Sequence, residues 1–160
     1  MVDLALLVGK ILALAHGELA SHQIVLRNEM GERLPEVMAA RVQLQQVILN
    51  LIMNAIESMS SVTGRERRLT IGSCLTQPET LTITVDDTGI GIDPAHFDHI
   101  FDPFFTTKAQ GMGLGLSICR SIIEAHGGKL SASPRTPFGS SFSLSLPISA
   151  ASSSGQSSKS

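Results

Sequence analysis

Apolar residues recur at the spacing of an α-helix in two stretches of the chain. The first runs from Leu4 to Leu19 and the second from Val42 to Ser58. In both, apolar side chains return every three or four residues, so each helix would bury a single apolar stripe against a core. A further helix is predicted from Leu114 to Ala125, because Gly127 and Gly128 follow it in positions typical of a helix C-cap.

Short β-rich segments separate these helices. The segments expected to form strands are 23–27, 36–38, 69–75, 81–85, 129–133 and 141–146. Helices and strands are mixed without strict alternation, which favours an α+β fold: a two-layer sandwich with helices over one face of a mixed sheet. We expect one domain over residues 1–148 and a flexible Ser-rich tail over residues 149–160.

Composition narrows the class of protein. The chain has 160 residues, 42% of them hydrophobic, which suits one well-filled core. The formal net charge is -2, so nothing in the charge balance favours a nucleic-acid partner. Cys74 and Cys119 lie far apart within apolar patterns. We interpret both as small core residues in a reducing compartment, rather than as a disulfide or a metal-binding pair.

The apolar opening of the chain does not predict a membrane segment. Asp3 stands where a signal peptide would carry basic residues. Lys10, His16 and Glu18 interrupt the apolar run well short of the roughly 20 residues that span a bilayer. We therefore expect an amphipathic helix with one buried face.

Two asparagines stand four residues apart in the second predicted helix. Asn50 and Asn54 would project from one face of that helix, one turn apart. Asparagine is mildly unfavourable inside a helix, because its side chain competes for backbone hydrogen bonds. Taken alone, a pair of amides facing solvent is the simpler interpretation, and a ligand site requires further motifs.

Three further motifs follow along the chain. Residues 87–91 read Asp-Thr-Gly-Ile-Gly after a β-rich run, residues 101–105 read Phe-Asp-Pro-Phe-Phe, and residues 111–116 read Gly-Met-Gly-Leu-Gly-Leu. Glycines at the start of a helix expose backbone N–H groups that can bind an anion. The glycine-rich loop is not a Rossmann fingerprint, since no strand feeds it directly. It is not a P-loop either, since the Gly-Lys-Ser/Thr ending is missing.

Together with the asparagine pair, these motifs resemble the N, first glycine, F and second glycine boxes of the histidine-kinase catalytic domain. The resemblance runs from about Leu4 to Pro147. It implies the Bergerat ATP-binding fold, with ATP and Mg²⁺ as cofactors. The run 104–108, Phe-Phe-Thr-Thr-Lys, is similar to the nitrogen- and oxygen-regulation type of sensor kinase.

The resemblance also implies roles for single residues. Asn54 would be the ligand of the Mg²⁺ that bridges the nucleotide phosphates, since an amide oxygen is a hard ligand. Asp87 would accept the exocyclic amine of adenine, while Asp86 faces elsewhere. Gly89 and Gly91 would let the backbone approach the base, where a Cβ would clash. The other nucleotide-binding residues that the resemblance implies are Ile92, Phe101, Thr107, Lys108, Gly111, Gly113, Leu114, Gly115, Leu116 and Ser141.

The resemblance also implies a lid over the expected pocket and a serine in its wall. The aromatic segment that begins at Phe101 is interpreted as part of a lid that closes over ATP. Lys108 would then lie near the phosphates as a point charge for the γ-phosphate. Ser140 or Ser141 would line the base pocket, and we select Ser141.

Asn50 distinguishes phosphoryl transfer from hydrolysis. In the related ATP hydrolases the matching position is a glutamate that activates water, and an amide cannot act as a general base at neutral pH. We therefore expect transfer of the γ-phosphoryl group to a protein acceptor, with Asn50 and Lys108 as the catalytic residues.

The function that the resemblance implies is that of the catalytic domain of a sensor histidine kinase. It would bind Mg-ATP and supply the γ-phosphoryl group to a histidine on a dimerisation domain, with a response-regulator receiver domain downstream. None of the chain's five histidines has the sequence context of that acceptor, so we expect it outside this chain. The chain would be cytoplasmic, whether or not the parent kinase is attached to a membrane. Two alternatives stay open: a nucleotide-binding scaffold without catalysis, and a hydrolysing ATPase of the wider GHKL superfamily.

Overall fold

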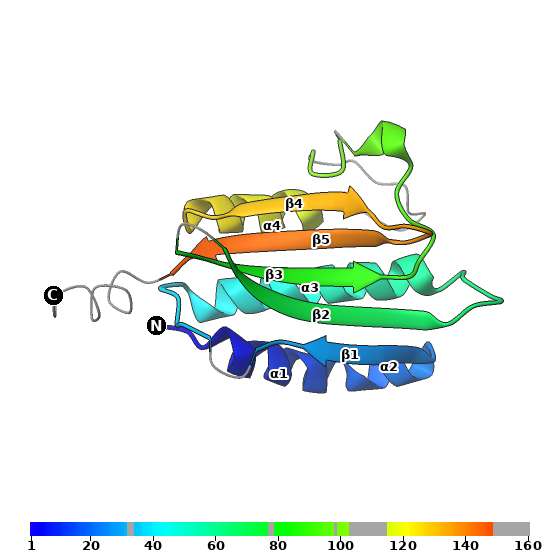
Figure 1. Cartoon of the computed structure of the whole chain (residues 1–160), viewed down its shortest axis with the longest axis horizontal. Helices are drawn as coiled ribbons and strands as arrows, with labels where there is room; N and C mark the ends of the chain where they lie inside the picture. The colour runs from blue at the N-terminus through cyan, green and yellow to red at the C-terminus, as the bar shows by residue number, and fades with distance from the viewer. Residues whose placement is uncertain (32–33, 77–78, 98, 103–114, 149–160) are drawn as a thin grey trace, which may run out of the picture.

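Helices cover one face of a mixed five-stranded sheet in the computed structural model of the chain (Figure 1). The structure describes residues 1–31, 34–76, 79–97, 99–102 and 115–148. Its strands are β1 (Ile24–Glu29), β2 (Arg67–Thr76), β3 (Thr80–Asp87), β4 (Lys129–Pro134) and β5 (Ser140–Pro147). They lie in the order β1-β2-β3-β5-β4, with β1 parallel to β2 and the other pairs antiparallel. The α+β two-layer fold predicted from the sequence is confirmed.

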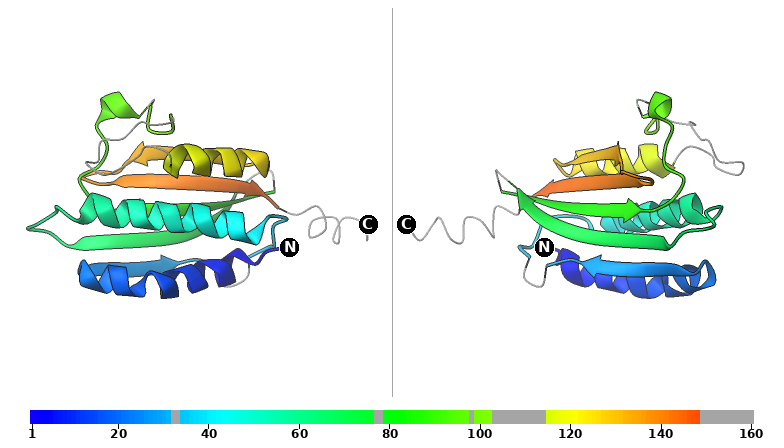
Figure 2. Two further views of the ribbon diagram at one scale, coloured as in Figure 1. Left: turned by 180° about the vertical axis from the view of Figure 1, so that it is seen from behind. Right: turned by 45° about the vertical axis from the view of Figure 1, so that its right-hand side comes forward.

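The helices carry the apolar stripes that the sequence predicts. They are α1 (Leu4–Leu14), α2 (His16–Ser21), α3 (Arg41–Met59) and α4 (Gly115–Ala125), with a short 3-10 helix η1 at Pro94–His96. Figure 2 shows α3 between α1 and α4 on the covered face of the sheet. Among its buried side chains, Leu44, Ile48 and Leu51 are each at most 1% exposed. Burying each such side chain stabilises the fold by about 1.5–3 kcal/mol, so α3 is firmly held at the centre of the helical layer.

The sequence predicts one continuous helix from Leu4 to Leu19, but the structure divides this segment into two helices. Helix α1 ends at Leu14 and α2 begins at His16, with Ala15 between them at φ -85° and ψ -2°. This ψ value departs from that of a regular helix, and the helix is interrupted at this residue. Gly17 just beyond the break weakens the intrinsic preference for continuing the helix. Leu19 nevertheless remains buried, so the apolar stripe survives the break.

The strand predicted at residues 36–38 is reduced to an isolated bridge. Val37 exchanges two backbone hydrogen bonds with Val2, of 2.8 and 3.0 Å, and does not join the five-stranded sheet. Pro35 precedes this segment and has no N–H group to donate to a longer ladder.

The two cysteines have different surroundings. Cys119 of α4 is fully buried, as predicted, whereas Cys74 on β2 is exposed, so its assignment to the core was wrong. Cys74 lies opposite Thr82 of β3, and their side chains belong to the face of the sheet that the helices do not cover. Both cysteines are free thiols.

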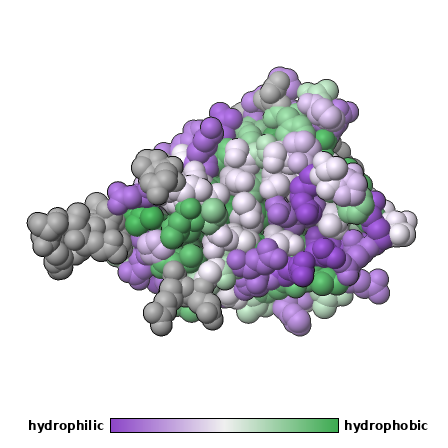
Figure 3. All heavy atoms as spheres, in the orientation of Figure 1, coloured by the Kyte–Doolittle hydropathy of each residue, from purple (hydrophilic) through white to green (hydrophobic). Residues whose placement is uncertain are grey.

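Threonine and serine residues recur on that uncovered face of the sheet, much of which is pale, of intermediate hydropathy, in Figure 3. Its cross-strand pairs include Thr70 opposite Asp86 and Thr84 opposite Ser143. On the covered face of the same strands, Ile83 and Leu144 are completely buried. The two-residue alternation of β3 and β5 thus separates a polar face from the core. Within the described part of the chain, the helices are too short or too polar to cross a membrane.

His126 connects the end of α4 to the start of α3. Its Nε2 accepts a hydrogen bond of 3.1 Å from the Ala40 N–H, and its Nδ1 lies 2.7 Å from the Ile122 carbonyl oxygen. A neutral ring with its proton on Nδ1 satisfies both contacts at once.

We predict that His126→Ala lowers the free energy of unfolding by about 1 kcal/mol, because the Ala40 N–H loses its side-chain acceptor and the Ile122 carbonyl keeps only its backbone partner. Urea unfolding followed by circular dichroism measures this loss. His16→Ala, on the exposed start of α2, is the matched control and should change stability little. Equal effects of the two substitutions would contradict the connecting role of His126.

Candidate functional site

Asn50 and Asn54 lie on the side of α3 that faces α4. Both residues are partly buried. The Nδ2 of Asn50 donates a hydrogen bond of 3.6 Å to the Sγ of Cys119 on α4. Asn54 stands one turn further along the same face of the helix. The two amides therefore lie beside α4, in agreement with the helical spacing in the sequence.

The carboxylate of Asp87 is buried at the end of β3. The residue is only 1% exposed, and its two oxygens accept hydrogen bonds from different elements. The Gly89 N–H donates to Oδ1 at 2.8 Å, and the Ser140 hydroxyl donates to Oδ2 at 3.0 Å. Each oxygen can accept a second hydrogen bond, so the carboxylate can still bind a donor group of a ligand.

Burial raises the pKa of Asp87 above its ordinary value of 3.8. Desolvation is the largest cause, because a charged carboxylate loses the surrounding water that stabilises it. The hydrogen bonds from Gly89 and Ser140 and the positive charge of Arg135 act in the opposite direction and lower the pKa. An acid in these surroundings is a strong candidate for a functional group.

Ser140, and not Ser141, is the serine that contacts Asp87. In the register of β3 and β5, Asp87 lies opposite Ser140 while Asp86 lies opposite Ser141. Successive side chains of a strand point to opposite faces, so the side chain of Ser141 belongs to the uncovered face with Asp86. The serine beside Asp87 is therefore Ser140, which is 2% exposed, and not Ser141 as expected from the sequence. Asp86 faces away from Asp87, as predicted.

The glycines of the turn after β3 meet protein neighbours. A Cβ on Gly89 would lie 2.7 Å from the carbonyl oxygen of Ser58, near the end of α3, and would overlap its Oγ. The Ile90 N–H donates to that same carbonyl oxygen at 3.2 Å. Packing on α3 thus requires a glycine at 89, a reason that the sequence did not suggest. Gly91 has φ +81°, a conformation that favours glycine.

The described part of the aromatic segment packs on the core. The ring of Phe101 meets the ring of Phe142 edge-on, with centroids 6.3 Å apart. The guanidinium carbon of Arg120 lies 5.8 Å from the centroid of Phe101, and its Nε lies 3.6 Å from Glu124. Ile92 and Leu116 are partly buried against the same core. Gly115 is the first residue of α4 in the structure, and the start expected at Leu114 lies outside the described residues.

Several predicted site residues lie outside the described part of the chain. They are Thr107, Lys108, Gly111, Gly113 and Leu114. The tail predicted over 149–160 also lies outside it. For these residues the roles given above stay predictions.

Two arginines of the site were not identified from the sequence. Arg65 Nη2 donates to the carbonyl oxygens of Thr88 at 3.1 Å and Gly89 at 2.8 Å. Arg135 Nη1 donates to the carbonyl oxygen of Asp87 at 3.2 Å. In the sequence, Arg65 stands in a charged run after a helix, and no short-range pattern connects it with residues 88–89.

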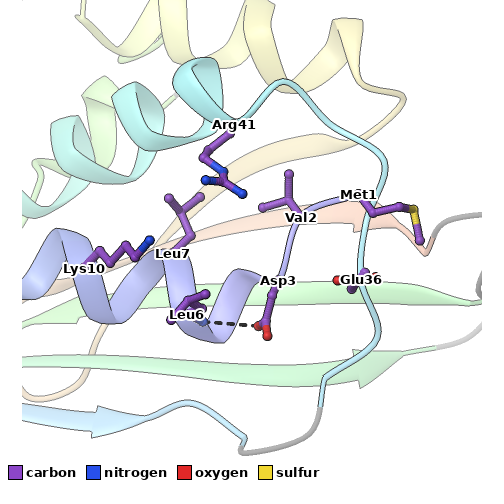
Figure 4. A pocket seen from close by; sticks show the side chains of 8 residues that line it. All are labelled: Met1, Val2, Asp3, Leu6, Leu7, Lys10, Glu36 and Arg41. Atoms are coloured by element: carbon purple, nitrogen blue, oxygen red, sulfur yellow. Dashed lines mark hydrogen bonds between the residues drawn. The ribbon is translucent and has the colours of Figure 1, made fainter.

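A separate pocket of about 230 Å³ lies between the start of α1 and the start of α3 (Figure 4). Acidic, basic and apolar side chains line this pocket: Met1, Val2, Asp3, Leu6, Leu7, Lys10, Glu36 and Arg41. None of the predicted site residues belongs to it. Among the described residues, no cluster of three or more His, Cys, Asp or Glu side chains is arranged to hold a metal ion.

The model of one protein family, the histidine kinase-, DNA gyrase B- and HSP90-like ATPases, matches residues 39–150. This range is well over half of the chain. The chain belongs to this family. Its acid–glycine turn, its asparagine helix and the start of α4 all fall within the matched range, so the family predicted from these motifs is confirmed.

Sensor kinases are among the relatives of this ATPase domain. The chain is 41% identical to the sensor protein TdiS of Thauera aromatica over 128 residues, which cover 79% of the chain and 23% of TdiS. It is 38% identical to the sensor histidine kinase TmoS of Ectopseudomonas mendocina, over 92% of the chain and 15% of TmoS. The chain therefore spans less than a quarter of the length of either relative.

Solved structures agree with this assignment. The catalytic domain of histidine kinase ThkA, in a nucleotide-free form, superposes with a TM-score of 0.80 at 35% identity, covering 92% of this chain and 94% of that domain. The same kinase in complex with the response regulator TrrA matches with a TM-score of 0.76 at 34% identity, covering 92% of this chain and 41% of that one. The chain thus corresponds to the histidine-kinase catalytic domain. The finer subtype suggested by residues 104–108 stays a prediction.

The raised pKa of Asp87 makes the stability of this domain depend on pH. A carboxyl group with a raised folded-state pKa contributes stability that is fully present below its ordinary value, here 3.8. This contribution is lost as the pH rises through the folded-state pKa. We predict that, as the pH is lowered from neutrality, the wild type gains free energy of unfolding relative to Asp87→Asn.

Urea unfolding at a series of pH values measures that difference. Asp86→Asn is the matched control, one residue away and on the opposite face of the sheet. A difference between wild type and Asp87→Asn that stays constant with pH would contradict the effect of burial.

Proposed function

We propose that this domain binds Mg-ATP and supplies its γ-phosphoryl group to a histidine of a dimerisation domain in the same kinase. The observation that carries the proposal is the buried carboxylate of Asp87, held by Gly89 and Ser140 and still able to accept a donor. The exocyclic amine of adenine is such a donor. A pocket built around a hydrogen bond strongly rejects a base that lacks the matching group.

The asparagine pair supports the phosphate end of the same site. The turn that carries Asp87 contacts Ser58 through the Ile90 N–H, and Ser58 stands one turn beyond Asn54 on α3. The acid and the amides are thus supported by one helix. Asn54 would hold Mg²⁺ through its amide oxygen, together with phosphate oxygens and water. When bound, Mg²⁺ neutralises charge on the phosphates.

The remaining roles are positioning and contact with phosphate. Phosphoryl transfer requires little covalent chemistry from the protein, and positioning supplies most of the rate enhancement. Asn50 replaces a general base with an amide, and its hydrogen bond to Cys119 holds it beside α4. We assign to Lys108, Thr107 and the glycines 111 and 113 the phosphate contacts implied by the family motifs.

The proposed partners follow from the same family relationship. The acceptor histidine would lie on a dimerisation domain, and a response-regulator receiver domain would take the phosphoryl group afterwards. ThkA was solved with a response regulator, which supports this class of partner. We also propose a cytoplasmic location for this domain.

A second candidate function is ATP hydrolysis, as the name of the family includes ATPases. Asn50 disfavours it, because an amide does not activate water at neutral pH. The third, a nucleotide-binding scaffold, shares the pocket but not the transfer. Detection of phosphohistidine in the parent kinase supplied with ATP separates the proposed function from both alternatives.

The magnesium role of Asn54 predicts a specific loss of binding. In Asn54→Ala, ADP should still bind without Mg²⁺, while the gain in affinity that Mg²⁺ gives the wild type should disappear, because the protein ligand of the ion is removed. Calorimetric titration of ADP with and without Mg²⁺ measures both quantities.

Gln43→Ala removes an exposed amide from the start of the same helix and is the matched control. It should keep the Mg²⁺-dependent gain. If Asn54→Ala keeps that gain as well, the ligand assignment is wrong, whereas a folded wild-type chain that binds no nucleotide would contradict the proposed function as a whole.

A further inference from the structure

We propose that Arg65, together with Arg135, is a positioning residue that orients the carboxylate of Asp87 for adenine recognition. The inference rests on the proposed function, since it concerns how the same pocket selects its base. It starts from the carbonyl oxygens of three consecutive residues of one turn, each of which accepts a hydrogen bond from a guanidinium group.

The first step concerns which peptide groups the arginines hold. Arg135 Nη1 binds the carbonyl oxygen of Asp87 at 3.2 Å. Arg65 Nη2 binds the carbonyl oxygens of Thr88 at 3.1 Å and Gly89 at 2.8 Å. Each peptide group is planar, so fixing its oxygen also restricts the direction of its N–H.

The second step connects one of these peptide groups to the acid. The carbonyl of Thr88 and the N–H of Gly89 belong to the same peptide plane. That N–H donates to Oδ1 of Asp87 at 2.8 Å. Arg65 therefore binds the oxygen of the Thr88–Gly89 peptide group, and the N–H of the same group orients the carboxylate of Asp87.

The third step concerns what holds Arg65 itself. Its guanidinium carbon lies 3.8 Å from the centroid of the Phe138 ring, in the turn between β4 and β5. Arginine stacks on aromatic faces and donates in its own plane at the same time, which lysine cannot reproduce. Next to Phe138, Gly139 packs so closely on Asp87 that a Cβ would overlap the Asp87 carbonyl oxygen.

These contacts join three loops around one carboxylate. Arg65 comes from the segment between α3 and β2, Asp87 ends β3, and Arg135 and Phe138 come from the turn between β4 and β5. A pocket that distinguishes adenine from guanine must place an acceptor accurately, because the two bases exchange a donor for an acceptor at the same ring position. Loosening the turn should therefore reduce discrimination between the bases.

The test compares ADP and GDP affinities by calorimetry in the 160-residue chain. In Arg65→Lys we expect the preference for ADP over GDP to fall about fivefold through weaker ADP binding, since a hydrogen bond of this kind contributes about that factor. Arg68→Lys is the matched control, because the Arg68 side chain pairs with exposed Glu66 outside the turn. It should keep the preference of the wild type.

Thermal unfolding without nucleotide separates orientation from stability. Phe138→Leu removes the stacking surface while leaving both arginines in place, and it should reduce the same preference even where Arg65→Lys fails to fold. An unchanged ADP preference in folded Arg65→Lys, whatever its stability, would overturn the inference while leaving the proposed function intact. A wild-type chain that binds ADP and GDP equally, or neither, would instead overturn the proposed function and the inference with it.

Discussion

The buried carboxylate of Asp87 at the end of β3 constrains the structure around it. Burying a charge is costly unless hydrogen bonds compensate it. For Asp87 they come from the Gly89 N–H in its own turn and from the Ser140 hydroxyl on the neighbouring strand. The bond from Gly89 requires a tight turn after β3, which packs on the end of α3. The bond from Ser140 requires that β5 pair with β3 in one register. The turn around this acid thereby connects the helix that carries the asparagines to the sheet.

This arrangement divides the site between two kinds of support. The acid that would read the base stands on a strand, within a buried network whose oxygens are already oriented. The amides that would serve the phosphate end stand on α3, which is held by apolar side chains along its length. Both supports are regular elements of the fold. A scaffold of this kind suits catalysis by positioning, in which the protein supplies orientation and charge rather than a nucleophile.

Much of this could be predicted from the sequence, because periodicity reports which side of an element is buried. The helical period located α3 and both asparagines, and the order of the four motifs identified the family. What failed depended on contacts distant in sequence. The choice between Ser140 and Ser141 is a one-residue question of register that only the pairing with β3 decides. Likewise, the segment expected as a strand at 36–38 pairs only with Val2, through an isolated bridge. No local pattern in the sequence connects Arg65 with the carbonyl groups of residues 88–89.

The most direct measurement is the affinity of ADP for the wild-type chain and for Asp87→Asn, by calorimetry. The substitution replaces one of the two acceptor oxygens with an NH2 donor and removes the negative charge, so the Kd should rise about 30-fold or more, as expected for loss of a hydrogen bond to a charged group. Asp86→Asn, with its side chain on the uncovered face, should bind ADP as the wild type does. Undiminished affinity in a folded Asp87→Asn would contradict the claim that this buried carboxylate recognises adenine.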